Sequence, residues 1–195
     1  KFTGGLSPIM LAMRFAPLAI VLIAVALSIV LYPRLPDPMP VALLLPLIMA
    51  GTAGLFAALP HEGNASAFRA VTLSTLAFLL CVHIMLLLMA MGTRLNAIFI
   101  MTALVGALFI VLGTSMSGMR RNFIIGIRTP WTLANDDVWD RTHRLGGRIF
   151  MIAGALLMIA PFGGLKAVAI AFPTIAIGAA LIPSVYSYVI SRRGI

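Results

Sequence analysis

The chain alternates long apolar runs with short polar connections. The runs cover residues 15–32, 41–60, 70–93, 95–119, 149–165 and 167–191. A helix needs about 17–25 mostly apolar residues to cross a bilayer, and every run meets that length. The residue-by-residue alternation of a membrane β-barrel strand is absent from the sequence. The pattern therefore predicts an all-α polytopic membrane protein with six transmembrane helices.

Composition supports this prediction. Of the 195 residues, 62% are hydrophobic and 10% are charged, against about 45–50% and about 25% in an ordinary soluble domain. The first run is longer than the apolar core of a secretory signal and ends at Tyr32-Pro33-Arg34 without a small-residue cleavage pattern, so we expect a retained helix. Cys81 is the single cysteine, which excludes an intrachain disulfide.

The basic residues predict an orientation. With six spans, eleven of the fourteen Lys and Arg residues fall on the side that holds both termini and the connection after the fourth span. The other side holds Arg34, Arg94 and Lys166. By the positive-inside rule, both termini and that connection are expected in the cytoplasm. The net charge of +9 is thus an orientation signal, and without a nucleic-acid motif we expect no direct nucleic-acid binding.

The connection between the fourth and fifth spans contains "TLANDDVWDRTHRLGGR". Asn135 is a favoured N-cap, and two aspartates follow it in the first turn, where the helix dipole favours carboxylates. Acid-then-base pairs recur at a spacing of four, from Asp137 to Arg141 and from Asp140 to Arg144. The sequence predicts a short amphipathic cytoplasmic helix between helices 4 and 5, which leads into helix 5 through Gly146-Gly147.

Two interpretations of this stretch remain open. Its tryptophans suit the lipid headgroup layer, which favours an interfacial anchor. Trp and Arg are also enriched at binding hot spots, which favours a docking surface for a soluble partner. The residues expected to serve one of these roles are Arg128, Trp131, Trp139, Arg141, His143, Arg144 and Arg148.

The string "NFIIGIRTPWTLANDDVWDRTHRLGGRIF" closely resembles the signature of the SdpI family of bacterial membrane proteins. "LPDPMP", "LLLPLIMAG" and "LAFLLCVHIMLLLMAMG" resemble the short domain of unknown function that commonly precedes the SdpI domain. The resemblance implies an N-terminal three-helix region at residues 1–94 and an SdpI-like three-helix region at residues 95–195.

The resemblance also implies a function and a location. It implies a multi-pass protein of the bacterial inner membrane that confers immunity to a secreted toxin, signals by docking a soluble cytoplasmic regulator, or does both. The alternative is a structural or accessory subunit that packs against neighbouring membrane subunits. Membrane lipids are expected partners under either hypothesis.

The predicted spans contain few ionisable or metal-ligating side chains. All five carboxylates lie outside them, whereas an ion-coupled transporter usually places an ionisable group within its helix bundle. His83 is the one ionisable candidate there, and we favour a hydrogen bond to a neighbouring helix over a proton site. Cys81 and His83 project about 200° apart on a helix, so they cannot share a metal ion. We expect no catalytic residue, no cofactor and no metal, and therefore no enzyme.

Overall fold

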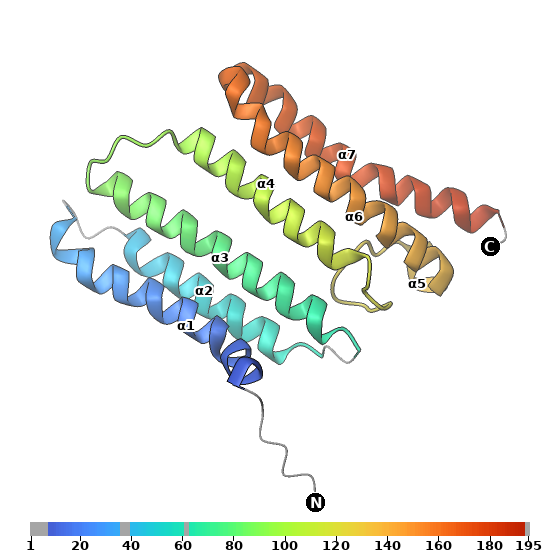
Figure 1. Cartoon of the computed structure of the whole chain (residues 1–195), viewed down its shortest axis with the longest axis horizontal. Helices are drawn as coiled ribbons and strands as arrows, with labels where there is room; N and C mark the ends of the chain where they lie inside the picture. The colour runs from blue at the N-terminus through green and yellow to red at the C-terminus, as the bar shows by residue number, and fades with distance from the viewer. Residues whose placement is uncertain (1–7, 36–39, 61–62, 194–195) are drawn as a thin grey trace, which may run out of the picture. The chain divides into compact units, whose positions relative to one another are not determined.

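The computed structural model describes residues 8–35, 40–60 and 63–193, and every regular element within these ranges is helical. The elements are α1 (Pro8–Leu31), η1 (Tyr32–Arg34), α2 (Pro40–Ala58), α3 (Ala65–Ala90), α4 (Ala97–Met116), α5 (Pro130–Ala134), α6 (Asp136–Ile159), η2 (Ala160–Gly163) and α7 (Gly164–Arg192). Figure 1 shows them in chain order. The prediction of an all-α membrane protein is confirmed.

Four segments are long and apolar enough to cross a membrane: Phe15–Arg34, Ala65–Ala90, Ala97–Met116 and Asp136–Arg192. The last has 57 residues and contains both α6 and α7, joined by the short turn η2. Ala42–Ala58 is a shorter apolar helix. Six long helices therefore correspond to the six apolar runs of the sequence.

The chain divides into two compact units. The first comprises Lys1–Ala58 with Thr75–Leu95, and the second comprises Leu59–Ser74 with Asn96–Ile195. In the first unit, Val21 and Ala24 of α1 form a buried cluster with Met49 of α2 and Leu76 of α3. These apolar contacts hold the first unit together.

His83 provides the polar contact of the first unit. Its Nε2 atom lies 3.0 Å from the Ser28 hydroxyl on α1, which itself lies 2.5 Å from the Ala42 carbonyl oxygen on α2. Because the hydroxyl has one hydrogen to give to that carbonyl, the imidazole Nε2–H donates to Ser28. The expected hydrogen bond from His83 to a neighbouring helix is confirmed.

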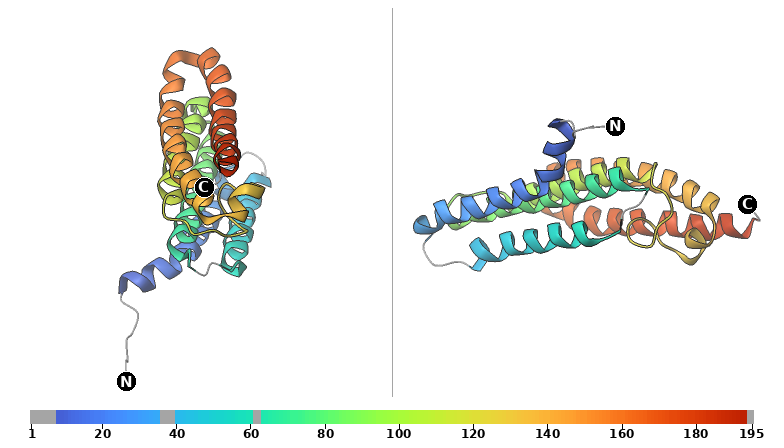
Figure 2. Two further views of the ribbon diagram at one scale, coloured as in Figure 1. Left: turned by 90° about the vertical axis from the view of Figure 1, so that its right-hand side faces the viewer. Right: turned by 90° about the horizontal axis from the view of Figure 1, so that it is seen from below.

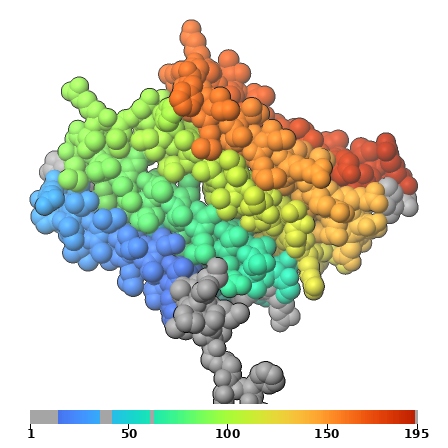
Figure 3. All heavy atoms as spheres, viewed as in Figure 1, coloured from blue at the N-terminus to red at the C-terminus, as the bar shows by residue number. Residues whose placement is uncertain are grey.

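The second unit is built around close contact between α4 and α6. A Cβ added at Gly106 would lie 2.6 Å from the Gly154 carbonyl oxygen, and one added at Gly113 would lie 2.6 Å from the Gly147 carbonyl oxygen. The two glycines of each helix are seven residues apart, so both pairs fall on one seam between antiparallel helices. In the all-atom view, the atoms of α4 and α6 lie directly against each other (Figure 3). Such backbone contact requires residues without a side chain.

Helix α6 differs from its sequence-based prediction. The start is as expected, since the Asn135 side chain accepts hydrogen bonds from the amides of Asp137 and Val138. The helix then continues without a break to Ile159, so the expected surface helix is the first half of a longer one. Gly146 and Gly147 lie within this continuous helix and are packing positions. A Cβ at Gly146 would overlap the Ile127 side chain, and one at Gly147 would overlap the backbone of α4.

The last two long helices form a hairpin. Figure 1 and Figure 2 show α6 and α7 side by side, joined by η2 at one end. Gly164 begins α7 with a φ of +79°, a conformation that favours glycine. The first thirteen residues of α6 carry six charged side chains, so the spanning part of this helix starts at Ile149.

Candidate functional site

The candidate site is the connection from α4 to α6 together with the first turns of α6. Two stacked rings hold it in place. The Trp139 and His143 rings lie 3.9 Å apart between centroids, at an angle of 21°. Their side chains are 0% and 1% exposed. They lie one turn apart on the face of α6 that is turned toward the loop.

Each ring binds one end of the loop. The Trp139 indole Nε1–H donates to the Met119 carbonyl oxygen at 2.7 Å. The Ile127 amide donates to the His143 Nε2 atom at 3.0 Å. Because Nε2 must accept that bond, the proton resides on Nδ1, which donates to the Trp139 carbonyl oxygen at 2.9 Å. One helical turn thus fixes both ends of a nine-residue loop segment, from residue 119 to residue 127.

Burial lowers the pKa of His143, against smaller opposing effects of its hydrogen bond to Trp139 and of the Asp140 carboxylate. The neutral form therefore predominates near neutral pH, as the accepting role of Nε2 requires. Gly126 lies against the same atom with a φ of +106°, and a Cβ there would overlap His143 Nε2. Glycine is required at residue 126 for both reasons.

A second network of hydroxyl groups positions α5. Thr129 is the N-cap of α5, and it exchanges hydrogen bonds with Thr132 in a capping box. The Thr132 hydroxyl also lies 2.8 Å from the Ile127 carbonyl oxygen. The Thr129 hydroxyl lies 3.0 Å from that of Ser187 on α7. The "RTPWT" motif therefore connects the loop to α7.

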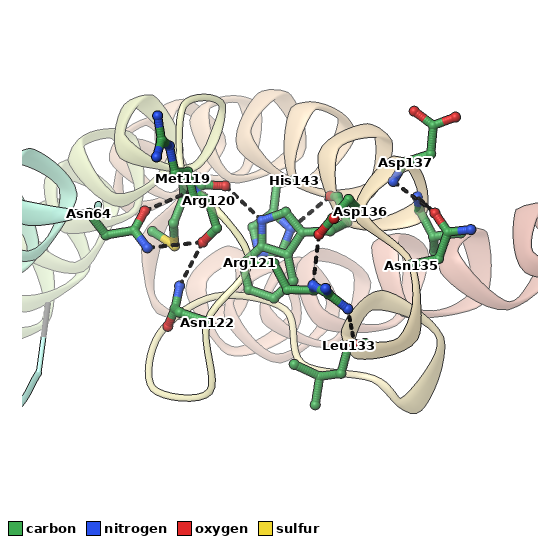
Figure 4. A network of polar contacts seen from close by, with 12 residues as sticks. Asn64, Met119, Arg120, Arg121, Asn122, Leu133, Asn135, Asp136, Asp137 and His143 are labelled. Carbon is green, nitrogen blue, oxygen red and sulfur yellow. Dashed lines mark hydrogen bonds and ion pairs between the residues drawn. The ribbon is translucent and has the colours of Figure 1, made fainter. Parts of the chain in front are cut away.

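Asn64, just before α3, holds the start of the loop (Figure 4). Its side-chain oxygen accepts from the Arg120 amide at 2.7 Å, and its side-chain nitrogen donates to the Arg120 carbonyl oxygen at 3.1 Å. A primary amide that pairs with both backbone groups of one residue fixes that residue's orientation. Asn122 then closes a turn by accepting from the amides of Ile124 and Ile125.

Three arginines of the connection have acceptors within the chain. Arg121 pairs with the Asp136 carboxylate at 2.7 Å and also donates to the Leu133 carbonyl oxygen at 2.6 Å, as Figure 4 shows. Arg128 donates to the Phe123 carbonyl oxygen at 2.6 Å. Arg141 lies 3.8 Å from the Asp137 carboxylate, in the spacing predicted from the sequence.

The seven candidate residues differ in burial and fall into three groups. Trp139 and His143 are buried between α6 and the loop. The burial of Trp139 differs from the position in the lipid headgroup layer that the sequence predicted. Trp131 is half-buried, and its ring contacts the Tyr188 ring edge-on at 5.0 Å between centroids. The exposed members are Arg128, Arg141, Arg144 and Arg148.

The sequence analysis did not predict several residues that hold this loop in place. Asn64 lies far away in the chain, and the Met119 carbonyl oxygen has no sequence signal at all. Thr132 and Gly126 lie inside the signature string, where hydroxyl and glycine positions could have suggested a capping box and a close contact. Within the described residues, no three His, Cys, Asp or Glu side chains are grouped as metal ligands.

The apolar helices are those of a multi-helix integral membrane protein. Its polar loop at residues 119–127, held at both ends by Trp139 and His143, is called the pinned loop below. Residues 119–187 match the model of the SdpI/YfhL protein family. A curated relative, "Immunity protein SdpI" of Bacillus subtilis (strain 168), is 33% identical over 76 residues, which cover 39% of this chain and 37% of the relative. Residues 119–187 are therefore similar to the SdpI/YfhL protein family, and the match covers little more than a third of the relative's length. No solved structure matches the chain.

The matched region coincides with the pinned loop and the helices that hold it. It begins at Met119, whose carbonyl oxygen binds Trp139. It ends at Ser187, whose hydroxyl lies against Thr129. The part of the chain that resembles the family therefore contains both partners of these two contacts.

Proposed function

We propose that this chain is a non-enzymatic protein of the bacterial inner membrane that confers immunity to a secreted toxin and docks a soluble partner on its cytoplasmic side. The similarity to a relative that is named as an immunity protein supports the first part. The positive-inside count supports cytoplasmic termini and a cytoplasmic α4–α6 connection. The two proposed activities would lie on opposite sides of the membrane.

The observation that carries the docking proposal is the division of α6 into a buried and a charged face. Thr142, His143 and Gly146 are buried against the rest of the unit. Arg141, Arg144 and Arg148 follow each other at spacings of three and four and are exposed, so they share one face of the helix. A row of arginines on one helix face is electrostatically complementary to an acidic protein surface, and this complementarity raises the rate of association.

The docking proposal is tested by charge reversal. We expect Arg141→Glu combined with Arg144→Glu to reduce, by tenfold or more, the amount of soluble protein cross-linked to the chain in native membranes. The matched control is Arg94→Glu, which makes the same charge change on the predicted outer side. Equal recovery from the double variant and the control would contradict docking on this face.

The immunity proposal is tested in the native host. We expect deletion of the gene to reduce survival in spent medium of the same strain, and the intact chain to restore it. Arg141→Glu with Arg144→Glu should restore survival as well, because these side chains lie on the cytoplasmic side. Unchanged survival of the deletion strain would refute the immunity role. Co-purification with stoichiometric membrane proteins in mild detergent would favour the accessory-subunit alternative instead.

A further inference from the structure

A polar cavity lies between the end of α4 and the first turns of α6. Its volume is about 220 Å³, well above the roughly 10–15 Å³ that a single water molecule needs. A phosphate group fits in that space with water to spare. The cavity is lined by Ser117, Gly118, Met119, Arg120, Asp140 and Arg144.

The arginines in this cavity differ from their neighbours in the loop. Arg121, Arg128 and Arg141 each direct a guanidinium nitrogen to an acceptor of the chain. Among the described residues, the terminal guanidinium nitrogens of Arg120 and Arg144 have no such acceptor. Two arginines that line one cavity, and whose terminal nitrogens have no acceptor among the described residues, are suited to bind an anion.

Both arginines are held in position before any ligand arrives. Asn64 binds the amide and the carbonyl oxygen of Arg120. The Arg120 side chain also passes over Gly63, where a Cβ would lie 3.3 Å from its Cδ atom. The Arg144 Nε–H donates to the Asp140 carbonyl oxygen at 3.4 Å. The floor of the cavity is fixed by the bond from Trp139 to Met119.

The cavity lies at the depth of lipid phosphates. Arg120 is four residues beyond Met116, the last residue of a candidate span, and Arg144 is five residues before Ile149. At about 1.5 Å per helical residue, Arg144 lies roughly 7–8 Å from Ile149. Residues 117–120 are not helical, but Arg120 lines the same cavity as Arg144. The headgroup region on each side of a bilayer is about 5–8 Å thick. Both arginines thus lie beside headgroups rather than beside acyl chains.

We propose that this cavity binds the phosphodiester headgroup of a membrane phospholipid. Arg120 and Arg144 bind the phosphate oxygens, and the Ser117 hydroxyl is available as a third donor. Asp140 also lines the cavity, and its carboxylate, as a hydrogen-bond acceptor, favours headgroups that carry a donor. An ethanolamine ammonium group or a glycerol hydroxyl provides one, whereas the quaternary ammonium of choline does not. The site goes beyond the proposed function, because it requires no toxin and no soluble partner.

The test is lipid binding to the purified full-length chain in mild detergent, measured by native mass spectrometry. We expect phosphatidylethanolamine and phosphatidylglycerol to bind at least fivefold more tightly than phosphatidylcholine. Arg120→Gln with Arg144→Gln should weaken both preferred lipids tenfold or more. The control is Arg141→Gln, on the same helix but paired with Asp137 outside the cavity. Equal binding by the double variant and this control would overturn the proposal.

Two further measurements separate the alternatives. Asp140→Ala, which removes the acceptor, should bring phosphatidylethanolamine and phosphatidylcholine to similar affinities while phosphate binding persists, and an unchanged preference would overturn the assigned role of Asp140. Glycerol 3-phosphate and inorganic phosphate serve as soluble probes. If either displaces the lipid at micromolar concentration, the ligand is a soluble phosphate and the lipid assignment fails.

The variants must also be shown to fold, and the near-ultraviolet signal of the buried Trp139 provides that readout. Arg120→Gln alone distinguishes this proposal from docking, because Arg120 does not belong to the row of Arg141, Arg144 and Arg148. We expect it to lose lipid selectivity at least threefold while recruitment of a soluble partner is unchanged. Retained lipid selectivity in this variant, with a native Trp139 signal, would overturn the assignment of Arg120.

Discussion

Replacing Gly113 with alanine tests whether direct backbone contact holds α4 against α6. The added Cβ would lie 2.6 Å from the Gly147 carbonyl oxygen and 2.9 Å from the Met151 amide nitrogen. Both atoms belong to the backbone of α6, so neither can rotate away. The helices must therefore separate locally, and this separation also removes contact around the second glycine pair, Gly106 and Gly154.

The expected magnitude follows from two opposing effects. Alanine is favoured over glycine in a helix interior by about 0.8–1.0 kcal/mol. Overpacking an interface that cannot relax costs about 1–3 kcal/mol, and more when only backbone is available to move. Because the contact at Gly113 involves backbone atoms of another helix, we expect the upper part of that range. The net loss in free energy of unfolding is then about 2 kcal/mol.

Thermal unfolding of the purified chain in detergent measures this loss. For a chain of this size, about 2 kcal/mol corresponds to a decrease in Tm of roughly 4–8 °C. The control is Gly178→Ala in α7, where the nearest atom to an added Cβ is the Ile182 Cδ1 atom at 3.9 Å. That variant should keep or slightly raise Tm. Equal Tm values for the two variants would show that the α4–α6 contact is not as close as described.

Three further predictions concern the pinned loop. Burial lowers the pKa of His143, so the unfolded chain binds a proton before the folded chain does as pH falls through about 6.5. Tm should therefore be lower at pH 5.5 than at pH 7.5, and His143→Gln should reduce this dependence of Tm on pH. Trp139→Phe leaves the buried Met119 carbonyl oxygen unpaired and should cost about 1–3 kcal/mol in a denaturant titration, whereas an unchanged midpoint would exclude the indole bond. The Thr132 hydroxyl is hydrogen-bonded and the buried Thr142 hydroxyl has no partner among the described residues, so Thr132→Val should lower Tm and Thr142→Val should leave it unchanged or raise it.

The long-range periodicity of the sequence was sufficient to predict the helices. Six apolar runs correspond to six long helices because the bilayer sets the length of a spanning segment. The N-cap at Asn135 was also predictable, since capping depends on residues a few positions apart. The pair of His143 and Trp139 on one helix face follows from the same local geometry.

The positions of the site residues depended on tertiary contacts. The sequence pattern indicated an interfacial position for Trp139, because the headgroup layer satisfies both the apolar ring and the polar N–H of a tryptophan. The structure buries it, since the Met119 carbonyl oxygen satisfies its N–H within the protein. Gly146-Gly147 was expected to join a separate surface helix to the fifth span. The packing role of these glycines depends on Gly113 and Ile127, which the local sequence around residue 146 does not reveal.

The attachment of the loop at both ends also has a thermodynamic consequence for recognition. A ligand that orders a flexible segment must offset the entropy of fixing its side chains and backbone, about 1–2 kcal/mol per residue for the backbone alone. Here Trp139 and His143 hold residues 119 and 127 in place without a ligand. That entropy is lost when the protein folds, so a lipid or a protein that binds the loop does not lose it again. A few charged contacts can therefore support useful affinity on this surface.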